Sequence, residues 1–159
     1  MKKSLVILPL ATLVLMMSFV AVASAAYAQS VVGYSPIGNG SVSNPNGILG
    51  SSPDGSYAQL YGGNLGDGGV IDVYMSTTVS SGAPVYLYSY SASGYYSHVY
   101  VYVSYDNSNW YLVGSGYVYG GPGWLYCGNA PITYRYIGIA AYDDEGWSAN
   151  FFIDCIYSA

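Results

Sequence analysis

The sequence predicts an all-β protein built as an antiparallel β-sandwich. Three observations predict this class. No helical hydrophobic period appears after residue 30, valine and tyrosine alternate through several segments, and Gly, Asn, Asp and Ser turns recur about every 8–12 residues. The chain has 159 residues, with 21 tyrosines and 21 glycines. Such a length allows one domain with a substantial hydrophobic core.

The alternation assigns residues to the two faces of each expected strand. In 84–91, Val85 and Leu87 share one face, and Val99, Val101 and Val103 do the same in 98–105. We expect these aliphatic faces to pack between two sheets, with the tyrosines directed outward or toward a partner. The tyrosines concerned are Tyr86, Tyr88, Tyr90, Tyr100 and Tyr102. The expected strands are 69–75, 84–91, 98–105, 110–117, 133–142 and 150–157, with shorter ones at 57–61 and 30–34.

The first 28 residues are typical of a secretory signal peptide. Lys2 and Lys3 form a basic start, residues 5–23 are nearly all apolar, and A-x-A cleavage patterns end at Ala25 and at Ala28. We expect this leader to be helical. An uncleaved membrane anchor is the alternative, because an apolar run of this length can span a bilayer. Both interpretations place the remainder at the cell surface or outside the cell.

The charge distribution excludes some partners. The whole chain carries a formal charge of −5, and removal of the two leader lysines makes it −7 with Arg135 as the remaining basic residue. A surface of this kind has no basic patch for phosphate backbones, so we expect no nucleic-acid binding. The sequon at Asn39 is a candidate glycosylation site.

The two cysteines, Cys127 and Cys155, form an even count in a chain expected to be secreted. This context favours one disulfide, with two buried free thiols as the alternative.

The residues that could support catalysis do not form a recognisable set. His98 is the single histidine and starts a strand without a G-x-S-x-G turn nearby. The acids at 143–145 are consecutive and would point in different directions, whereas glycoside hydrolysis needs carboxylates across a cleft. Asp67 and Asp72, which flank the start of an expected strand, remain possible as such a carboxylate pair. We therefore expect a protein that is not an enzyme.

Several segments in order resemble a known domain family. The stretch VYVSYDNSNWYLVG at 101–114 resembles the hairpin of discoidin-like, galactose-binding-type jelly rolls. TYRYIGIAA at 133–141 and NFFIDCIY at 150–157 resemble the later and closing strands of those domains. Upstream, SSPDGSYAQLYGG at 51–63 and GGVIDVYM at 68–75 resemble the early loop and strand of secreted members of that family. The resemblance spans about 46–158 and implies a jelly-roll-like sandwich of about eight strands, preceded by the signal helix. Tyrosine-rich strands and the scarcity of basic residues depart from that pattern.

The resemblance also implies ligands. Many such domains carry a structural calcium, for which Asp54 and Asp154 are the candidate ligands, supplemented by loop carbonyls around 46–50. Many bind carbohydrate or cell surfaces. Trp124 and Trp147, which the sequence places in or beside loops, could stack on sugar rings or could cap the core.

A second resemblance is one of composition. A small secreted β-sandwich with a Gly/Ser-rich N-terminal arm resembles subunits of extracellular filaments, pilus-like or cannula-like, of archaea and bacteria. Residues 29–45 would be a flexible arm that could donate a strand to the next subunit, and 46–159 would be the sandwich. Pairing of the arm within its own domain is the alternative.

Two functions therefore remain open. The first is a secreted structural or adhesive protein, a self-associating subunit of a filament or surface assembly. The alternative is a carbohydrate-binding module that recognises a cell-surface glycan. A membrane partner is expected only if the leader is retained.

Overall fold

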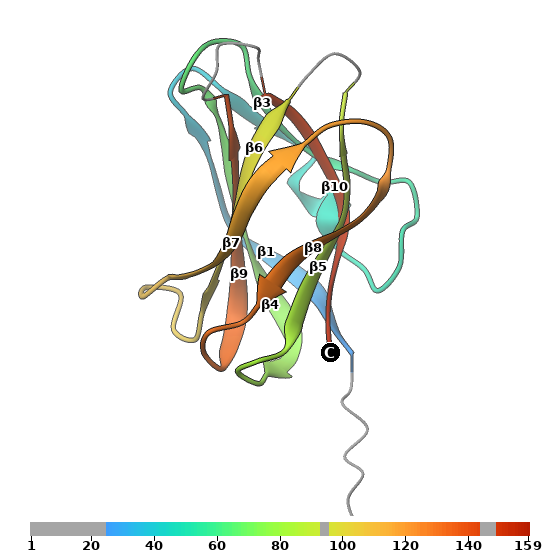
Figure 1. Cartoon of the computed structure of the whole chain (residues 1–159), viewed down its shortest axis with the longest axis vertical. Helices are drawn as coiled ribbons and strands as arrows, with labels where there is room; N and C mark the ends of the chain where they lie inside the picture. The colour runs from blue at the N-terminus through green and yellow to red at the C-terminus, as the bar shows by residue number, and fades with distance from the viewer. Residues whose placement is uncertain (1–24, 93–95, 144–148) are drawn as a thin grey trace, which may run out of the picture.

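The computed structural model describes residues 25–92, 96–143 and 149–159, which fold as two packed β-sheets (Figure 1). The expected leader helix lies in residues outside this description, apart from Ala25 to Ala28. No helix long and apolar enough to cross a membrane occurs among the residues described. The strands are β1 Ala26–Ile37, β2 Ser41–Ser43, β3 Ala58–Gly62, β4 Gly68–Val79, β5 Pro84–Ser91, β6 Ser97–Ser104, β7 Tyr111–Val118, β8 Gly123–Asn129, β9 Tyr134–Tyr142 and β10 Ala149–Ser158; a 3₁₀ helix, η1, covers Pro45–Ile48.

The strands form two antiparallel sheets joined by β1. Sheet A has the order β2-β3-β10-β5-β8, and sheet B has the order β1-β4-β9-β6-β7. The first residues of β1, Ala26 and Tyr27, pair with the end of β10, and β1 then continues along β4. This crossing links both layers at one corner. The all-β sandwich predicted from the sequence is confirmed.

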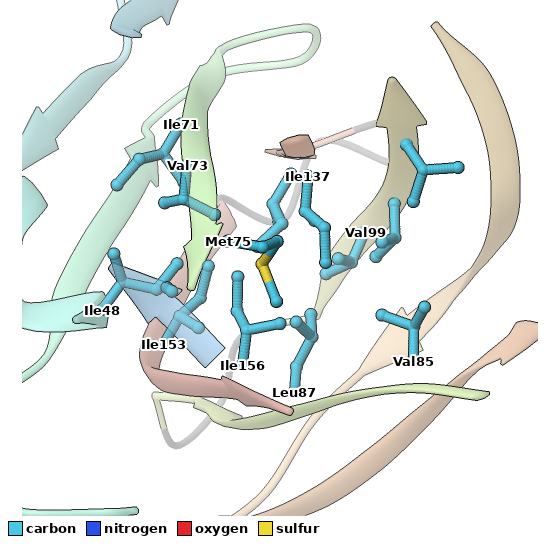
Figure 2. Close-up of a cluster of buried hydrophobic side chains, with 14 of the residues drawn as sticks. Ile48, Ile71, Val73, Met75, Val85, Leu87, Val99, Ile137, Ile153 and Ile156 are labelled. Carbon is cyan, nitrogen blue, oxygen red and sulfur yellow. The ribbon is translucent and has the colours of Figure 1, made fainter. Parts of the chain in front are cut away.

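The core lies between the sheets and is almost entirely aliphatic. Figure 2 shows Val73 and Met75 of β4 facing Leu87 of β5 and Ile156 of β10. All are fully buried or nearly so, as are the valines of β6 that the alternation assigned to the interior. Tyr134 is a core tyrosine, and burial raises its pKa to about 12. The predicted inner faces are therefore confirmed, because a period of two places successive side chains on opposite faces.

The described residues contain ten strands where about eight were expected. The strand 84–91 has the expected bounds, and the other expected strands overlap those observed. β2 and β8 were missed. β8 directly follows the glycine-rich turn at 119–122, and its short alternation is broken by Gly128, which has a φ of 132°. Trp124 is the second residue of β8, beside the glycine-rich turn at 119–122.

Residues 29–45, expected to be a flexible arm, are paired within the chain. β1 hydrogen-bonds to β4 over its whole length beyond Ala28, and β2 pairs with β3. The expected domain boundary at residue 46 therefore differs from the structure, where the sandwich includes β1. Donation of this segment to another subunit stays a prediction.

The expected disulfide is wrong for this structure, because Cys127 and Cys155 are both free thiols. They lie on β8 and β10, which are separated by β5, so their Cα atoms are more than about 9 Å apart at normal strand spacing. A disulfide requires Cα atoms within about 7 Å. Their faces differ as well. Cys127 packs against the core, whereas Cys155 pairs with the outward-facing Tyr88.

Candidate functional site

The outer face of sheet A carries a group of aromatic side chains, here called the aromatic platform. Alternation on β5 puts Tyr86 and Tyr88 on this face, and the antiparallel register adds residues from the two neighbouring strands. Tyr88 pairs with Trp124 of β8, while Tyr86 pairs with Tyr126 of β8 and Tyr157 of β10. Three strands distant in sequence thus build one surface. Its members are Tyr86, Tyr88, Trp124, Tyr126 and Tyr157.

The rings of the platform contact one another across the strands. The centroids of Tyr88 and Trp124 are 5.4 Å apart at an interplanar angle of 69°. Tyr86 lies 5.4 Å from Tyr126 and 6.1 Å from Tyr157. Trp124 is 6.3 Å from Tyr157, which closes the group. These spacings suit edge and tilted aromatic contacts, which restrict ring motion.

The platform is accessible to a ligand. Tyr86, Trp124 and Tyr157 line an open depression of about 370 Å³. Trp124 and Tyr126 remain 51% and 54% exposed, although other platform rings support them. An isolated exposed aromatic needs no explanation, but a contiguous group with an open depression is typical of a binding surface.

The platform continues toward the opposite end of sheet A. Tyr90 stacks on Phe152 with centroids 4.6 Å apart and an interplanar angle of 4°. Tyr57 meets Tyr90 edge-on at 5.1 Å. Burial, followed by the negative charge of Asp154, raises the pKa of Tyr57. Its hydroxyl therefore stays protonated at neutral pH.

Asp154 and Asp54, the candidate calcium ligands, are brought close together by the fold. The register between β10 and β5 shifts between Ile153 and Cys155, so Asp154 is the extra residue of a β-bulge. A bulge of this kind changes the direction of the side chain that it carries. Its carboxylate accepts hydrogen bonds from the backbone N–H of Asp54 at 3.1 Å and of Gly55 at 2.8 Å. Asp54 in turn accepts one from the backbone N–H of Ser56.

This arrangement is a hydrogen-bonded clasp. Calcium prefers six to eight oxygen ligands, and within the described ranges no three His, Cys, Asp or Glu residues cluster to hold a metal. The pair Asp54 and Asp154 does not by itself form a calcium cage, because backbone amides already occupy the Asp154 oxygens. Calcium binding stays a prediction.

The remaining candidates lie apart from the platform. Trp147 falls in 144–148, outside the described residues. Asn39 is exposed in the turn after β1, and its glycosylation stays a prediction. Tyr100 and Tyr102 lie on the outer face of sheet B, where Tyr100 stacks on Tyr142 at 5.3 Å.

His98 also belongs to that second aromatic group. Its ring lies 4.5 Å from Tyr117 and 4.3 Å from Tyr100. It is part of an aromatic stack on sheet B.

Sequence reasoning did not connect three residues that meet on the outer face of sheet B. Asp72, Trp110 and Gly138 come from three different segments and meet in a second depression. The indole of Trp110 lies over Gly138 on the outer face of the sheet. The alternation around Asp72 could have placed it outside, but nothing local connects it to Trp110.

The molecule thus belongs to the class of antiparallel β-sandwiches with a solvent-facing aromatic surface, and its fold is that of galactose-binding-type jelly rolls. Two of the solved structures that share this fold are a truncated AlyQ protein with CBM32 and alginate lyase domains and a pectin-binding carbohydrate-binding module. The first has a TM-score of 0.56 and 13% identity over 84% of this chain. The second has a TM-score of 0.51 and 11% identity, covering 79% of this chain and 88% of that one.

The same fold occurs in a family 32 module from a glycoside hydrolase of Clostridium perfringens, with a TM-score of 0.50, 14% identity, and coverage of 81% of this chain and 90% of that one. The chain spans 33% of the AlyQ chain, which also holds the lyase domain. No family model matches the sequence, and no curated protein matches it. The expected resemblance to discoidin-like jelly rolls is confirmed for the fold, and none of these similarities supports a filament subunit.

Proposed function

We propose that this protein is a carbohydrate-binding module and that the aromatic platform on sheet A is its binding surface. The observation that carries the proposal is the depression formed by Tyr86, Trp124 and Tyr157. Sugar rings present apolar C–H faces, and aromatic side chains offer such faces a large contact area at little entropic cost. The carbohydrate-binding modules that share the fold support this choice over the filament subunit.

The charge of the protein narrows the ligand class. Pectin, which one of the similar modules binds, is a polyanion. The present chain has a formal charge of −5 with its leader and contains 8 acidic residues. Repulsion would oppose a polyuronate, and Arg135 is engaged with Tyr74, away from the platform. We therefore propose a neutral glycan.

The proposal describes a binding protein without catalysis. The platform's five residues include no carboxylate or imidazole, so the platform lacks the carboxylate pair that most glycoside hydrolases use. Glycan recognition also fits the expected location at the cell surface or outside the cell. That location depends on the predicted leader.

Affinity electrophoresis in gels that contain neutral polysaccharides tests this function. Galactan, mannan and β-glucan serve as neutral ligands, and pectin serves as the anionic comparator. At least one neutral glycan should retard the protein, and Trp124→Ala should weaken retardation by about tenfold or more, as for a tryptophan at the centre of an interface. The matched control is Tyr34→Ala. Tyr34 is 58% exposed on β1, and the structure shows no ring contact for it.

Two results would overturn the proposal. One is equal retardation of Trp124→Ala and the unaltered protein. The other is a concentration-dependent oligomer in light scattering that Trp124→Ala converts to monomer, without glycan binding. The second result would identify the platform as a self-association surface.

A further inference from the structure

The outer face of sheet B holds a second depression, here called the Asp72 pocket. It has a volume of about 270 Å³ and lies on the sheet opposite the aromatic platform. Its walls and floor come from β4, β6, β9 and the turn before β7. The lining residues are Val70, Asp72, Tyr102, Trp110, Gly138 and Ala140.

Small residues on β9 make this pocket possible. A Cβ atom on Gly138 would stand 2.9 Å from Asp72 Oδ1 and 3.1 Å from Trp110 Cζ3. Asp72 and the indole therefore approach each other over a floor that has no side chain. On the other side of the carboxylate, Gly33 of β1 leaves a similar space, with a Cβ position 3.2 Å from Asp72 Oδ2.

The Asp72 carboxylate receives no hydrogen bond from the described residues. The other aspartates at loops and strand ends, such as Asp106 and Asp154, accept several. Arg135 lies on β9, next to the strand that carries Asp72. Its guanidinium group donates a hydrogen bond to the Tyr74 hydroxyl and lies 5.0 Å from the centroid of the Tyr74 ring. Burial raises the pKa of Asp72, which means that the fold removes water from this carboxylate without supplying a partner.

We infer that the Asp72 pocket binds the ammonium group of a small ligand that carries a protonated amine. A partly desolvated carboxylate gains most from a full positive charge, and the faces of tryptophan and tyrosine attract cations as well. A calcium ion would need several more oxygen ligands than this pocket provides. The net negative charge of the protein raises the local concentration of cations.

A neutral ligand fits this chemistry less well. Val70, Gly138 and Ala140 supply no polar side chain, so a neutral sugar would leave most of its hydroxyls without a partner in the pocket. Amino sugars and alkylammonium compounds combine a cation with an apolar body. This site is independent of the proposed glycan platform, because the two lie on opposite sheets.

Titration of the folded protein with matched probes at pH 7 tests the inference. The probes are glucosamine, its uncharged N-acetyl form and tetramethylammonium, with binding followed by the NMR signal of the Trp110 indole N–H. Glucosamine and tetramethylammonium should shift this signal, and N-acetylglucosamine should not. Asp72→Asn should weaken binding by about tenfold or more, and Trp110→Ala by about threefold to tenfold.

The controls separate this site from the platform. Asp54→Asn removes an equal charge from an exposed loop and should leave cation binding unchanged. Trp124→Ala should also leave it unchanged, whatever its effect on glycans. Far-ultraviolet circular dichroism checks that each variant is folded. The inference is overturned if the cations do not bind, if Asp72→Asn binds them equally well, or if N-acetylglucosamine binds as tightly as glucosamine.

Discussion

The carboxylate of Asp154 on β10 accepts a hydrogen bond from the backbone N–H of Asp54 at 3.1 Å, across 100 residues of sequence. Gly55 donates to the same carboxylate at 2.8 Å. These bonds fasten the loop before β3 to the closing strand. The Asp154 side chain therefore adds a tie between this loop and β10, beyond the backbone pairing of β3 with β10.

Asp154→Asn should destabilise the fold by about 1–3 kcal/mol, because charge-assisted bonds to backbone amides are lost from a buried site. Urea unfolding measures this change. Asp54→Asn is the control, since Asp54 is exposed and accepts one local bond from Ser56, and it should cost less. Equal losses of unfolding free energy in the two variants would contradict the stabilising role of the Asp154 carboxylate. A rise in Tm with calcium that Asp154→Asn abolishes would reveal the calcium site expected from the sequence.

The two thiols should remain free and unreactive in the folded protein. Burial raises the pKa of both Cys127 and Cys155 to about 12, so little thiolate exists at neutral pH. Ellman's reagent should titrate two thiols only after unfolding, and reductant should not change Tm. A mass two daltons below that of the reduced chain would contradict this.

The raised thiol pKa values also set the direction of the alkaline pH dependence. The folded state favours the protonated thiols, so their contribution is fully present below the unfolded pKa of about 8.5. It is lost as the pH rises from there toward about 12. A Cys127→Ala variant should lose less stability than the unaltered protein over that range.

Asp106 should stabilise the turn between β6 and β7 while it is ionised. Its pKa is held well below the ordinary value, first by the backbone N–H of Asn109 and then by the Asn109 side chain and the backbone of Ser108. The contribution is therefore present above the unfolded pKa of about 3.8 and falls as the pH drops toward the folded pKa. Asp106→Asn should lower Tm at pH 7 and lose that effect progressively in acid. A pH-independent difference would contradict this assignment.

Gly138→Ala should fill the Asp72 pocket and destabilise the sheet by about 1–3 kcal/mol through overpacking. The added Cβ meets both Asp72 and Trp110, so indole fluorescence should change too. Gly116→Ala on β7 is the matched control, because a Cβ there meets nothing within 4 Å. Thermal unfolding compares the two variants. A loss in Gly116→Ala as large as in Gly138→Ala would indicate a general cost of replacing glycine.

If the predicted leader is removed, cleavage should follow Ala25. Ala26 and Ala28 are both 1% exposed in β1, and Ala26 pairs with Ser158 of β10. Cleavage after Ala28 would remove this join between the sheets and should lower Tm. Amino-terminal sequencing of secreted protein identifies the site.

Much of the fold could be predicted from local pattern. The alternation of Val85 and Leu87 with Tyr86 and Tyr88 defined both faces of β5, because side chains of a strand alternate whatever its neighbours are. Trp124 was recognised as a binding candidate by its residue type. β8 itself was missed because turn glycines and Gly128 obscured seven residues of alternation.

What the sequence determined by itself was therefore the strand pattern, the inner and outer residues, and the acidic character of the surface. The tertiary structure alone decided that Trp124 meets Tyr88 and Tyr157, that Asp72 meets Trp110 over Gly138, and that β5 separates the two cysteines. The physical reason is that alternation acts between adjacent residues, whereas strand order and register arise from packing the whole core.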